Sequence, residues 1–382
     1  MIKALVAFDT TSRDSNLELI HFVEDYLNGH GVASTLVFND DKSKANLFAS
    51  IGPKQAQGGV VLSGHSDVVP VDGQSWTSDP FQVVERDGRL YGRGTCDMKG
   101  FLAVALALVP EFQNSGLRSP VHIVLTYDEE TDCSGAVRLM HALPEAGLAP
   151  RAVIIGEPTE MRIVNAHKGQ CTFETHIVGR EAHSSAPHLG INAIDIATRL
   201  IAYLNTLAVE IESLPQRMDG ATPPYSTINV GTISGGQQVN IVPAECRFDW
   251  EIRAIPGHDV DGIVQRFNAY AAELATQFSK KFYRAAIETT MTSAVAPFVR
   301  QDDSPAETLV KSLAGTNEAG SIAFGTEAPC YQQAGMSVVV FGPGSIAQAH
   351  KPDEFIALEQ VDACVDFMRR LMKHLADAAA AR

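Results

Sequence analysis

The chain has 382 residues, of which 45% are hydrophobic, so it is longer than one typical domain and can form hydrophobic cores. Its net charge of −15 disfavours nucleic acid and anionic membranes as partners, because both would repel it. The six cysteines are scattered without a C-x-x-C pair, which argues against a thiolate zinc site or a disulfide framework. No window reaches the ~18 apolar residues of a membrane span, and we expect a cytoplasmic protein.

Predicted helices and strands alternate through the first part of the chain. Continuous apolar runs that meet glycine are typical of strands buried on both faces, and helical spacing that stops at glycine indicates a helix end. Strands that alternate with helices predict an α/β fold with a doubly wound, mostly parallel sheet and right-handed crossovers. The expected elements are a helix over 13–31, strands over 36–38, 45–51 and 59–64, a helix over 101–112, a strand over 121–127, a helix over 134–143 and a strand over 153–155.

The middle of the chain has a different pattern. Polar and apolar residues alternate there, which predicts strands with one exposed face. We therefore expect an α+β domain of residues 170–288, inserted into a main domain of residues 1–169 and 289–382. Its predicted elements are strands over 172–178, 227–233 and 246–252 and helices over 191–207 and 259–276, after which a strand over 338–341 and a helix over 358–380 return to the main domain.

Residues of the types that bind metals follow the predicted strands of the main domain. In doubly wound sheets, sites form outside the carboxyl ends of the strands, so these side chains are expected to lie together. A glycine-rich loop at 92–100 adds one more carboxylate. The residues are His65, Asp67, Glu129, Glu130, Glu157 and His350, with Asp97 from the loop.

Two imidazoles and at least three carboxylates suit a pair of divalent ions. Asp97 is the natural bridge, because a carboxylate shared by ions about 3.5–4 Å apart is the usual way to hold such a pair. Taken singly, the residues also have simpler readings. Asp97 could cap the helix at 101–112, Glu129 and Glu130 could be solvated loop acids, and a histidine after a strand could be a satisfied polar residue. The glycine loop lacks the Gly-x-x-x-x-Gly-Lys-Ser/Thr pattern of a phosphate cradle.

Several runs, in order along almost the whole chain, resemble the dizinc aminoacylase and carboxypeptidase family. That family includes acetylornithine deacetylase, succinyl-diaminopimelate desuccinylase and glutamate carboxypeptidase. The resemblance implies that His65 and Glu157 bind one zinc, Glu130 and His350 the other, and Asp97 both, with cobalt as the alternative metal. The runs that carry it are residues 63–70, 92–100, 126–131, 156–159 and 342–350.

The same resemblance implies roles for residues that do not bind metal. Asp67 would orient His65, and Glu129 would act as the general base. In the inserted domain, the run 179–187 resembles a segment whose histidine, here His183, reaches across a homodimer to stabilise an oxyanion. Asn240 and Arg253 resemble residues that contact the substrate, and the fork of donors on Arg253 suits a carboxylate.

The implied reaction is hydrolysis of the amide of a small N-acyl-amino acid. Residues 325–329 and 342–355 are most similar to the branch that acts on N2-acetyl-ornithine, and we hypothesise that Glu327 holds the cationic amine of the substrate. Succinyl-diaminopimelate and other N-acyl-amino acids or peptides stay open as substrates. A two-metal phosphatase and a metal-binding protein without turnover are disfavoured by the order of the motifs and by the presence of Glu129.

Overall fold

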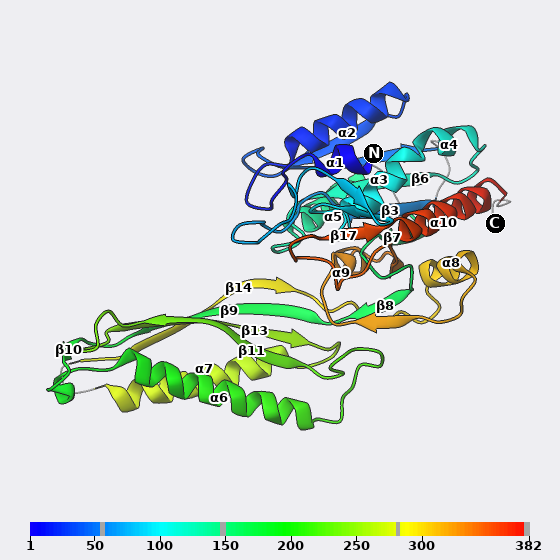
Figure 1. Cartoon of the computed structure of the whole chain (residues 1–382). Coiled ribbons are helices and arrows are strands. Elements are labelled where there is room, and N and C mark those ends of the chain that lie inside the picture. Colours follow the sequence, from blue (N-terminus) through cyan, green and yellow to red (C-terminus); the bar gives the residue numbers. More distant parts are fainter. Residues whose placement is uncertain (54–57, 146–149, 280–282, 378–382) are drawn as a thin grey trace. The chain divides into compact units, whose positions relative to one another are not determined.

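The computed structural model describes residues 1–53, 58–145, 150–279 and 283–377 (Figure 1). The chain divides into two compact units. Unit 1 comprises residues 1–166, 299–320 and 326–382, and unit 2 comprises residues 167–298 and 321–325. The predicted boundary at residue 288 falls inside strand β14 (Ala286–Val295), which belongs to unit 2 because it pairs with β9 over its length.

Unit 1 is built on an eight-stranded sheet with the order β1-β2-β6-β3-β7-β16-β8-β15. Its central pairs β3–β6, β3–β7 and β7–β16 are parallel, whereas β1–β2, β2–β6 and β16–β8 are antiparallel. The predicted α/β class is therefore confirmed. The strands are β1 (Ser34–Phe38), β2 (Ala45–Ile51), β3 (Val60–His65), β6 (Val121–Thr126), β7 (Ala152–Ile155), β8 (Val164–His167), β15 (Gly320–Ile322) and β16 (Val338–Val340).

Helices cover both faces of this sheet. Leu62, Ile123 and Ile154 lie in one core with side chains of α2, α3, α8 and α10. Because side chains alternate along a strand, Ser63 and Thr126 face the other way, toward α9. The helices are α1 (Ile2–Val6), α2 (Leu17–Gly29), α3 (Lys99–Ala107), α4 (Val109–Asn114), α5 (Ser134–Glu145), α8 (Pro305–Ala314), α9 (Ala328–Gln333) and α10 (Leu358–Asp377).

The helix predicted over 101–112 is two helices, α3 and α4. Pro110 lies in the first turn of α4, and since proline has no N–H it cannot continue the hydrogen bonds of α3. Of the predicted last helix, residues 378–380 lie outside the described residues. A small sheet that the sequence did not predict contains β4 (Val84–Arg86), β5 (Arg89–Tyr91) and β17 (Phe355–Ala357).

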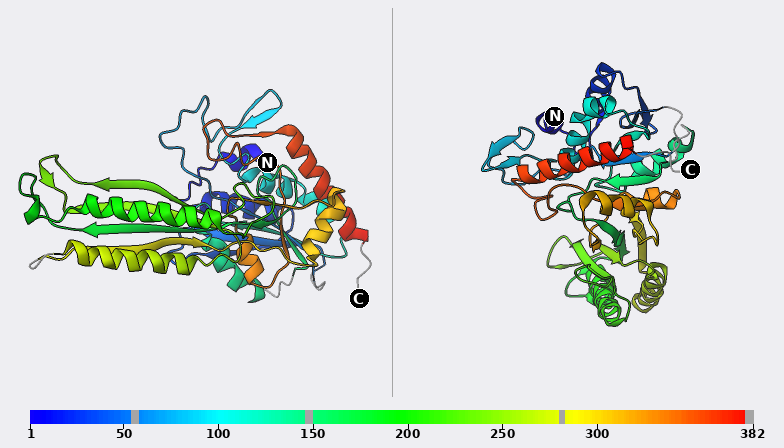
Figure 2. Two further views of the ribbon diagram at one scale, coloured as in Figure 1. Left: turned by 90° about the horizontal axis from the view of Figure 1, so that it is seen from below. Right: turned by 90° about the vertical axis from the view of Figure 1, so that its right-hand side faces the viewer.

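Unit 2 is a four-stranded antiparallel sheet, in the order β11-β13-β9-β14, with two helices packed against it (Figure 2). Asn192 and Asp259 accept hydrogen bonds from N–H groups of the first turns and so fix where α6 and α7 begin. Trp250, Phe267 and Phe248 fill the core between sheet and helices. The elements are β9 (Gly169–Val178), β10 (Ala182–His183), α6 (Ala193–Ser213), β11 (Thr227–Gly235), β12 (Ile241–Val242), β13 (Glu245–Ala254), α7 (Val260–Phe278) and β14.

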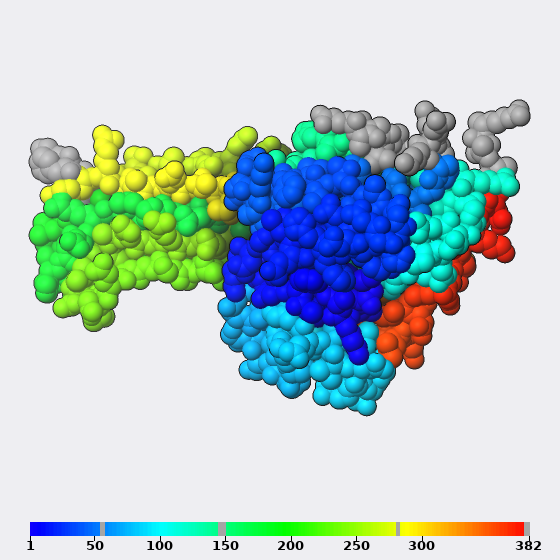
Figure 3. All heavy atoms as spheres, turned by 90° about the horizontal axis from the view of Figure 1, so that it is seen from above, coloured from blue at the N-terminus to red at the C-terminus, as the bar shows by residue number. Residues whose placement is uncertain are grey.

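In Figure 3 the N-terminal segments of unit 1, coloured blue to light blue, form a continuous surface. Within the described ranges, no helix has both the length and the apolar character needed to cross a membrane.

Candidate metal centre

The carboxyl ends of the parallel strands bring the predicted ligands together in unit 1. His65 is the last residue of β3 and Glu157 follows β7. The Nε2 atom of His65 lies 3.0 Å from Oδ1 of Asp97, and Nε2 of His350 lies 3.3 Å from Oδ2 of the same carboxylate. The same His350 nitrogen is 3.0 Å from Glu130 Oε2. Asp97 thus presents one oxygen to each histidine.

Two overlapping groups of side chains have the spacing of a metal site: His65, Glu129 and Glu157 form one, and His65, Asp97 and Glu130 form the other. His350 lies beside the second group through Asp97 and Glu130. All five predicted ligands therefore meet, while the division of ligands between two ions stays a prediction. Glu129, predicted as the base, lies 3.9 Å from His65 Nε2.

Negative charge exceeds positive charge at this site. Burial strongly raises the pKa of Glu129 and of Glu157, and the neighbouring carboxylates raise it further. Burial opposes protonation of His65, but Asp97, Glu129 and Glu157 outweigh it and raise the pKa of this imidazole well above its usual value. Hydrogen bonds to Asp97 and Glu130 raise the pKa of His350 to about 10.

The donor set fits divalent cations. Two buried carboxylates, of Asp97 and Glu157, and two half-buried ones, of Glu129 and Glu130, are gathered around two imidazoles. Bound cations would neutralise the negative charge that the two imidazoles leave uncompensated. Oε1 of Glu157 is buried and makes no hydrogen bond to any described residue, which leaves it available to an ion. Nδ1 of His65 donates to the carbonyl of Asp67 at 2.9 Å, so Nε2 is the nitrogen left to bind metal.

The carboxylate of Asp67 contacts other partners besides His65, and its role in orienting His65 stays a prediction. It lies 3.7 Å from Nδ1 of His65, and the carbonyl of Asp67 makes the hydrogen bond instead. The carboxylate accepts hydrogen bonds from Ser12 Oγ at 2.7 Å and from the backbone N–H groups of Glu129 and Glu130 at 3.2 and 3.3 Å. Asp67 therefore links the end of β3 to the loop that carries both glutamates.

Glu327 lies beneath the strands that carry the ligands. It is fully buried, Oε1 accepts from Ser63 Oγ at 2.5 Å, and Oε2 accepts from Thr126 Oγ1 at 2.7 Å. Tyr331 contacts the same Ser63 hydroxyl at 2.7 Å. Both carboxylate oxygens are occupied, so the structure does not offer them to a substrate amine, and that contact stays a prediction.

In unit 2, the structure brings His183 and Asn240 together. His183 pairs with Ile241 between β10 and β12, and Ser184 N donates to the carbonyl of Asn240 at 3.0 Å. Ser185 N donates to Nδ1 of His183, so in the neutral ring Nε2 carries the proton and can act as a donor. A cavity of about 420 Å³ lies beside this strand pair, lined by Glu181, Gly235, Ile241, Pro243 and Arg247 among others.

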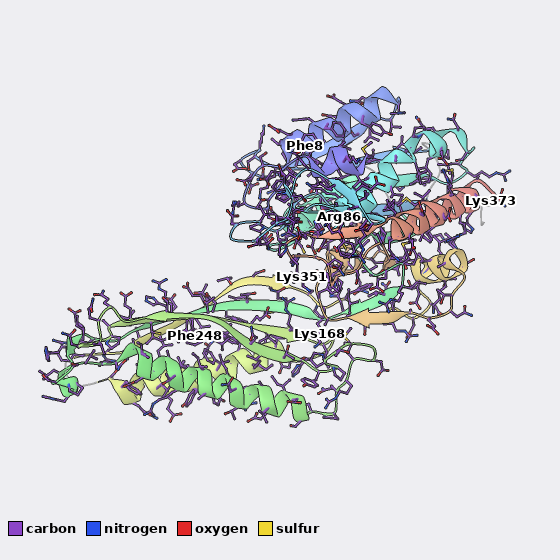
Figure 4. The ribbon with its side chains drawn as sticks, in the orientation of Figure 1. Phe8, Arg86, Lys168, Phe248, Lys351 and Lys373 are labelled. Carbon is purple, nitrogen blue, oxygen red and sulfur yellow. The ribbon has the colours of Figure 1, made fainter. Side chains whose placement is uncertain are left out.

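Arg253 lies in the four-stranded sheet of unit 2, near the end of β13, whereas β10 and β12 form a separate two-stranded sheet whose second strand precedes the start of β13. Arg253 pairs with Gln170, whereas Cys246 at the opposite end of β13 pairs with Ile177. At about 3.3 Å per residue, Arg253 and Cys246 are roughly 23 Å apart. In Figure 4, Lys168 lies near one end of unit 2 and Phe248, a residue of β13, lies farther along unit 2. Arg253 is paired with Glu251 at 3.0 Å.

Comparison with known proteins places these residues in a family. The pattern of "Peptidase family M20/M25/M40" matches residues 61–374. Acetylornithine deacetylase of Myxococcus xanthus is 38% identical and covers 97% of this chain and 95% of its own length. Acetylornithine deacetylase of Pasteurella multocida (strain Pm70) is 34% identical and covers 97% of this chain and 96% of its own length.

Solved structures share the fold. A tripeptidase of Staphylococcus aureus has a TM-score of 0.77 at 19% identity, covering 99% of this chain and 97% of its own. A protein of Bacillus subtilis described as a dinuclear metal-binding peptidase has a TM-score of 0.64 at 15% identity, with 99% and 97% covered.

Proposed function

This chain belongs to peptidase family M20/M25/M40 and is a hydrolase, and we propose that it removes the acetyl group from N2-acetyl-ornithine to give ornithine and acetate. The observation that carries the proposal is the meeting of two imidazoles and four carboxylates, with Asp97 between the two imidazoles. The relatives called acetylornithine deacetylase, at 32–38% identity over nearly the whole chain, support the choice of substrate. The product ornithine would place the enzyme in arginine biosynthesis, and a cytoplasmic location fits its six free cysteines.

Two divalent ions would be held by residues already in place. We propose His65 and Glu157 for one ion, Glu130 and His350 for the other, and Asp97 for both, with zinc expected and cobalt as the alternative. When bound, such ions supply Lewis acidity that polarises the amide carbonyl and activates water.

Glu129 is the proposed general base. Its carboxylate lies at the edge of the ligand cluster, 3.9 Å from His65 Nε2, and the N–H of its own backbone is held by Asp67. Burial raises its pKa, which suits a group that must take a proton from water and release it to the leaving nitrogen. The proton that Glu129 gains as the C–O bond forms is the one it delivers as the C–N bond breaks, so Glu129 ends the cycle unchanged.

A homodimer through unit 2 is the proposed active assembly. His183 would donate from Nε2 to the oxyanion, and Arg253 would hold the substrate carboxylate. However, His183 pairs with β12, which precedes the start of β13, whereas Arg253 lies near the end of β13. The roughly 23 Å along β13 exceeds what one small amino-acid substrate spans. A site that takes His183 and Asn240 from a second copy removes this conflict. The edge strand β11 supports a dimer through unit 2, because the C-terminal half of this strand is exposed and includes Ile233 at 53% exposure.

The test is release of ornithine from N2-acetyl-ornithine by protein loaded with zinc or cobalt. Succinyl-diaminopimelate, other acetyl-amino acids, a dipeptide and a phosphate ester are measured beside it. We expect strong preference for N2-acetyl-ornithine. Preference for another acyl-amino acid would refute the substrate and keep the chemistry, whereas hydrolysis of the phosphate ester alone would refute both. Glu129→Gln is expected to bind metal as the wild type does and to lose roughly 10²–10⁴ in rate.

A further inference from the structure

A buried carboxylate outside the ligand set holds the backbone of Asp97. Glu354 is 1% exposed, and its Oε1 accepts hydrogen bonds from the N–H groups of Cys96 at 2.9 Å and of Asp97 at 3.1 Å. Its Oε2 accepts from Nη1 of Arg93 at 2.7 Å. One carboxylate thus satisfies two N–H groups of the loop and the charge of a buried guanidinium.

Arg93 continues the network toward His350. Arg93 is 1% exposed, and its Nη2 donates to Oε1 of Gln74 at 2.6 Å. Nε2 of Gln74 then donates to the carbonyl of His350 at 3.1 Å, and Nη1 of Arg93 reaches the carbonyl of Lys351 at 3.4 Å. Hydrogen bonds therefore connect the backbone of Asp97 to the backbone of His350 without passing through either ligand atom.

Both ligand segments need such support. Asp97 lies in a loop before α3, where glycines such as Gly94, with a φ of +82°, provide no side chain to pack. His350 has a φ of 61°, which is unfavourable for a residue other than glycine, and its side chain is 51% exposed. The two segments adjoin the paired strands β5 and β17, and Gly92 N donates to the carbonyl of Glu354 at 2.9 Å, but this pairing stops short of Asp97 and His350. The contacts of Glu354 and Arg93 extend the connection to these two residues.

We propose that Glu354 and Arg93 are positioning residues that fix Asp97 and His350 at the separation required to share one cation. The inference rests on the proposed function, because it assumes that these two side chains bind metal. Neither residue touches the imidazole or carboxylate atoms of the cluster in the contacts described. Their effect would pass through the backbone of the loop at 92–97 and the segment at 350–354.

The test compares Glu354→Gln with Glu307→Gln. Glu307 is a matched control, since it is a buried acid of unit 1 that binds Asn165 at 2.9 Å and Lys311 at 2.8 Å, away from the ligand segments. In Glu354→Gln, an NH2 group replaces one of the two carboxylate oxygens. That donor would either face the guanidinium of Arg93 or take the place of the oxygen that accepts from the N–H groups of Cys96 and Asp97. We expect one of the two ions to bind roughly 10–100-fold more weakly in a zinc titration. Glu307→Gln should lower the melting temperature and leave both zinc affinities unchanged.

A second readout needs no metal. In the metal-free protein, the amide hydrogens of Cys96 and Asp97 should exchange faster in Glu354→Gln than in the wild type and in Glu307→Gln. Arg93→Lys provides a milder variant should Glu354→Gln not fold, since it retains the charge and loses the fork that reaches Gln74 and Glu354 together. Unchanged zinc affinities and unchanged amide exchange in both variants would overturn the positioning role. A wild-type protein that binds no divalent ion would instead overturn the proposed function.

Discussion

Mixed dimers offer a direct test of a site built from two copies. Asp97→Ala removes the shared ligand in unit 1, and His183→Ala removes the proposed oxyanion donor in unit 2. Alone, Asp97→Ala should be inactive, and His183→Ala should lose about 10²–10³ in kcat, as for other oxyanion donors. Mixed together, the two inactive proteins are expected to regain activity.

The size of the recovery follows from the geometry. In the proposed assembly, each site of a symmetric dimer would take unit 1 from one copy and His183 from the other. In a mixed dimer, the His183→Ala copy has an intact ligand cluster and receives His183 from its partner. Random mixing makes about half of the dimers mixed, and one of the two sites in each is complete, so about one quarter of wild-type activity should return.

The assay is ornithine release after the two variants are unfolded, mixed in equal amounts and refolded with zinc. Asp97→Ala mixed with Glu129→Gln is the matched control. Both defects lie in unit 1, so no site can be complete and no recovery is expected. A mixture of Asp97→Ala and His183→Ala that is no more active than the mean of its components would refute a His183 that acts across the dimer.

Three further predictions concern single residues. Glu327→Gln should lower kcat and leave the KM for N2-acetyl-ornithine unchanged, because both oxygens are bonded beneath the strands; a raised KM for this substrate alone would support the amine contact. Gly342→Ala should destabilise the fold by roughly 1–3 kcal/mol or more in thermal unfolding, because the added Cβ would lie 2.1 Å from the carbonyl oxygen of Gly156. The control Gly29→Ala should be tolerated, because its Cβ would meet nothing within 4 Å. Burial lowers the pKa of His167 to about 4 from an ordinary 6.5. The unfolded chain therefore binds a proton at a higher pH than the folded protein does, and the free energy of unfolding should fall by about 3 kcal/mol as the pH drops from about 6.5 to 4. His167→Gln should lose less stability than the wild type between pH 7 and pH 4 in urea unfolding, and an equal loss would contradict this account.

The strand ends of unit 1 could be predicted from the sequence because their signal is local. A continuous apolar run that meets glycine, as before His65, indicates a buried strand, and β3, β6 and β7 were expected within one or two residues at each end. Parallel strands then place their carboxyl ends at one edge, which is why His65 and Glu157 could be expected to meet. Pro110 is a local signal for the break between α3 and α4, but the apolar residues on either side of it favoured the prediction of a single helix.

The supporting network could not be predicted, because its signal is not local. Arg93 and Glu354 are 261 positions apart, and no spacing rule links an arginine in a glycine loop to a glutamate near the other end of the chain. The partners of Asp67 were missed for a related reason. Besides lying 3.7 Å from Nδ1 of His65, the carboxylate accepts from Ser12 and from the N–H of Glu129, and Ser12 is 55 positions away in the chain.

The measurement that tests the central claim most directly is the amount of zinc bound per chain by the wild type and by Asp97→Ala. Because Asp97 presents one oxygen to each histidine of the cluster, the wild type should bind two ions and Asp97→Ala should bind neither tightly. Asp72→Ala, which removes an exposed acid paired with Arg13, should bind as the wild type does. If Asp97→Ala retained both ions and hydrolysed N2-acetyl-ornithine at the wild-type rate, a shared carboxylate at the centre of this site would be contradicted.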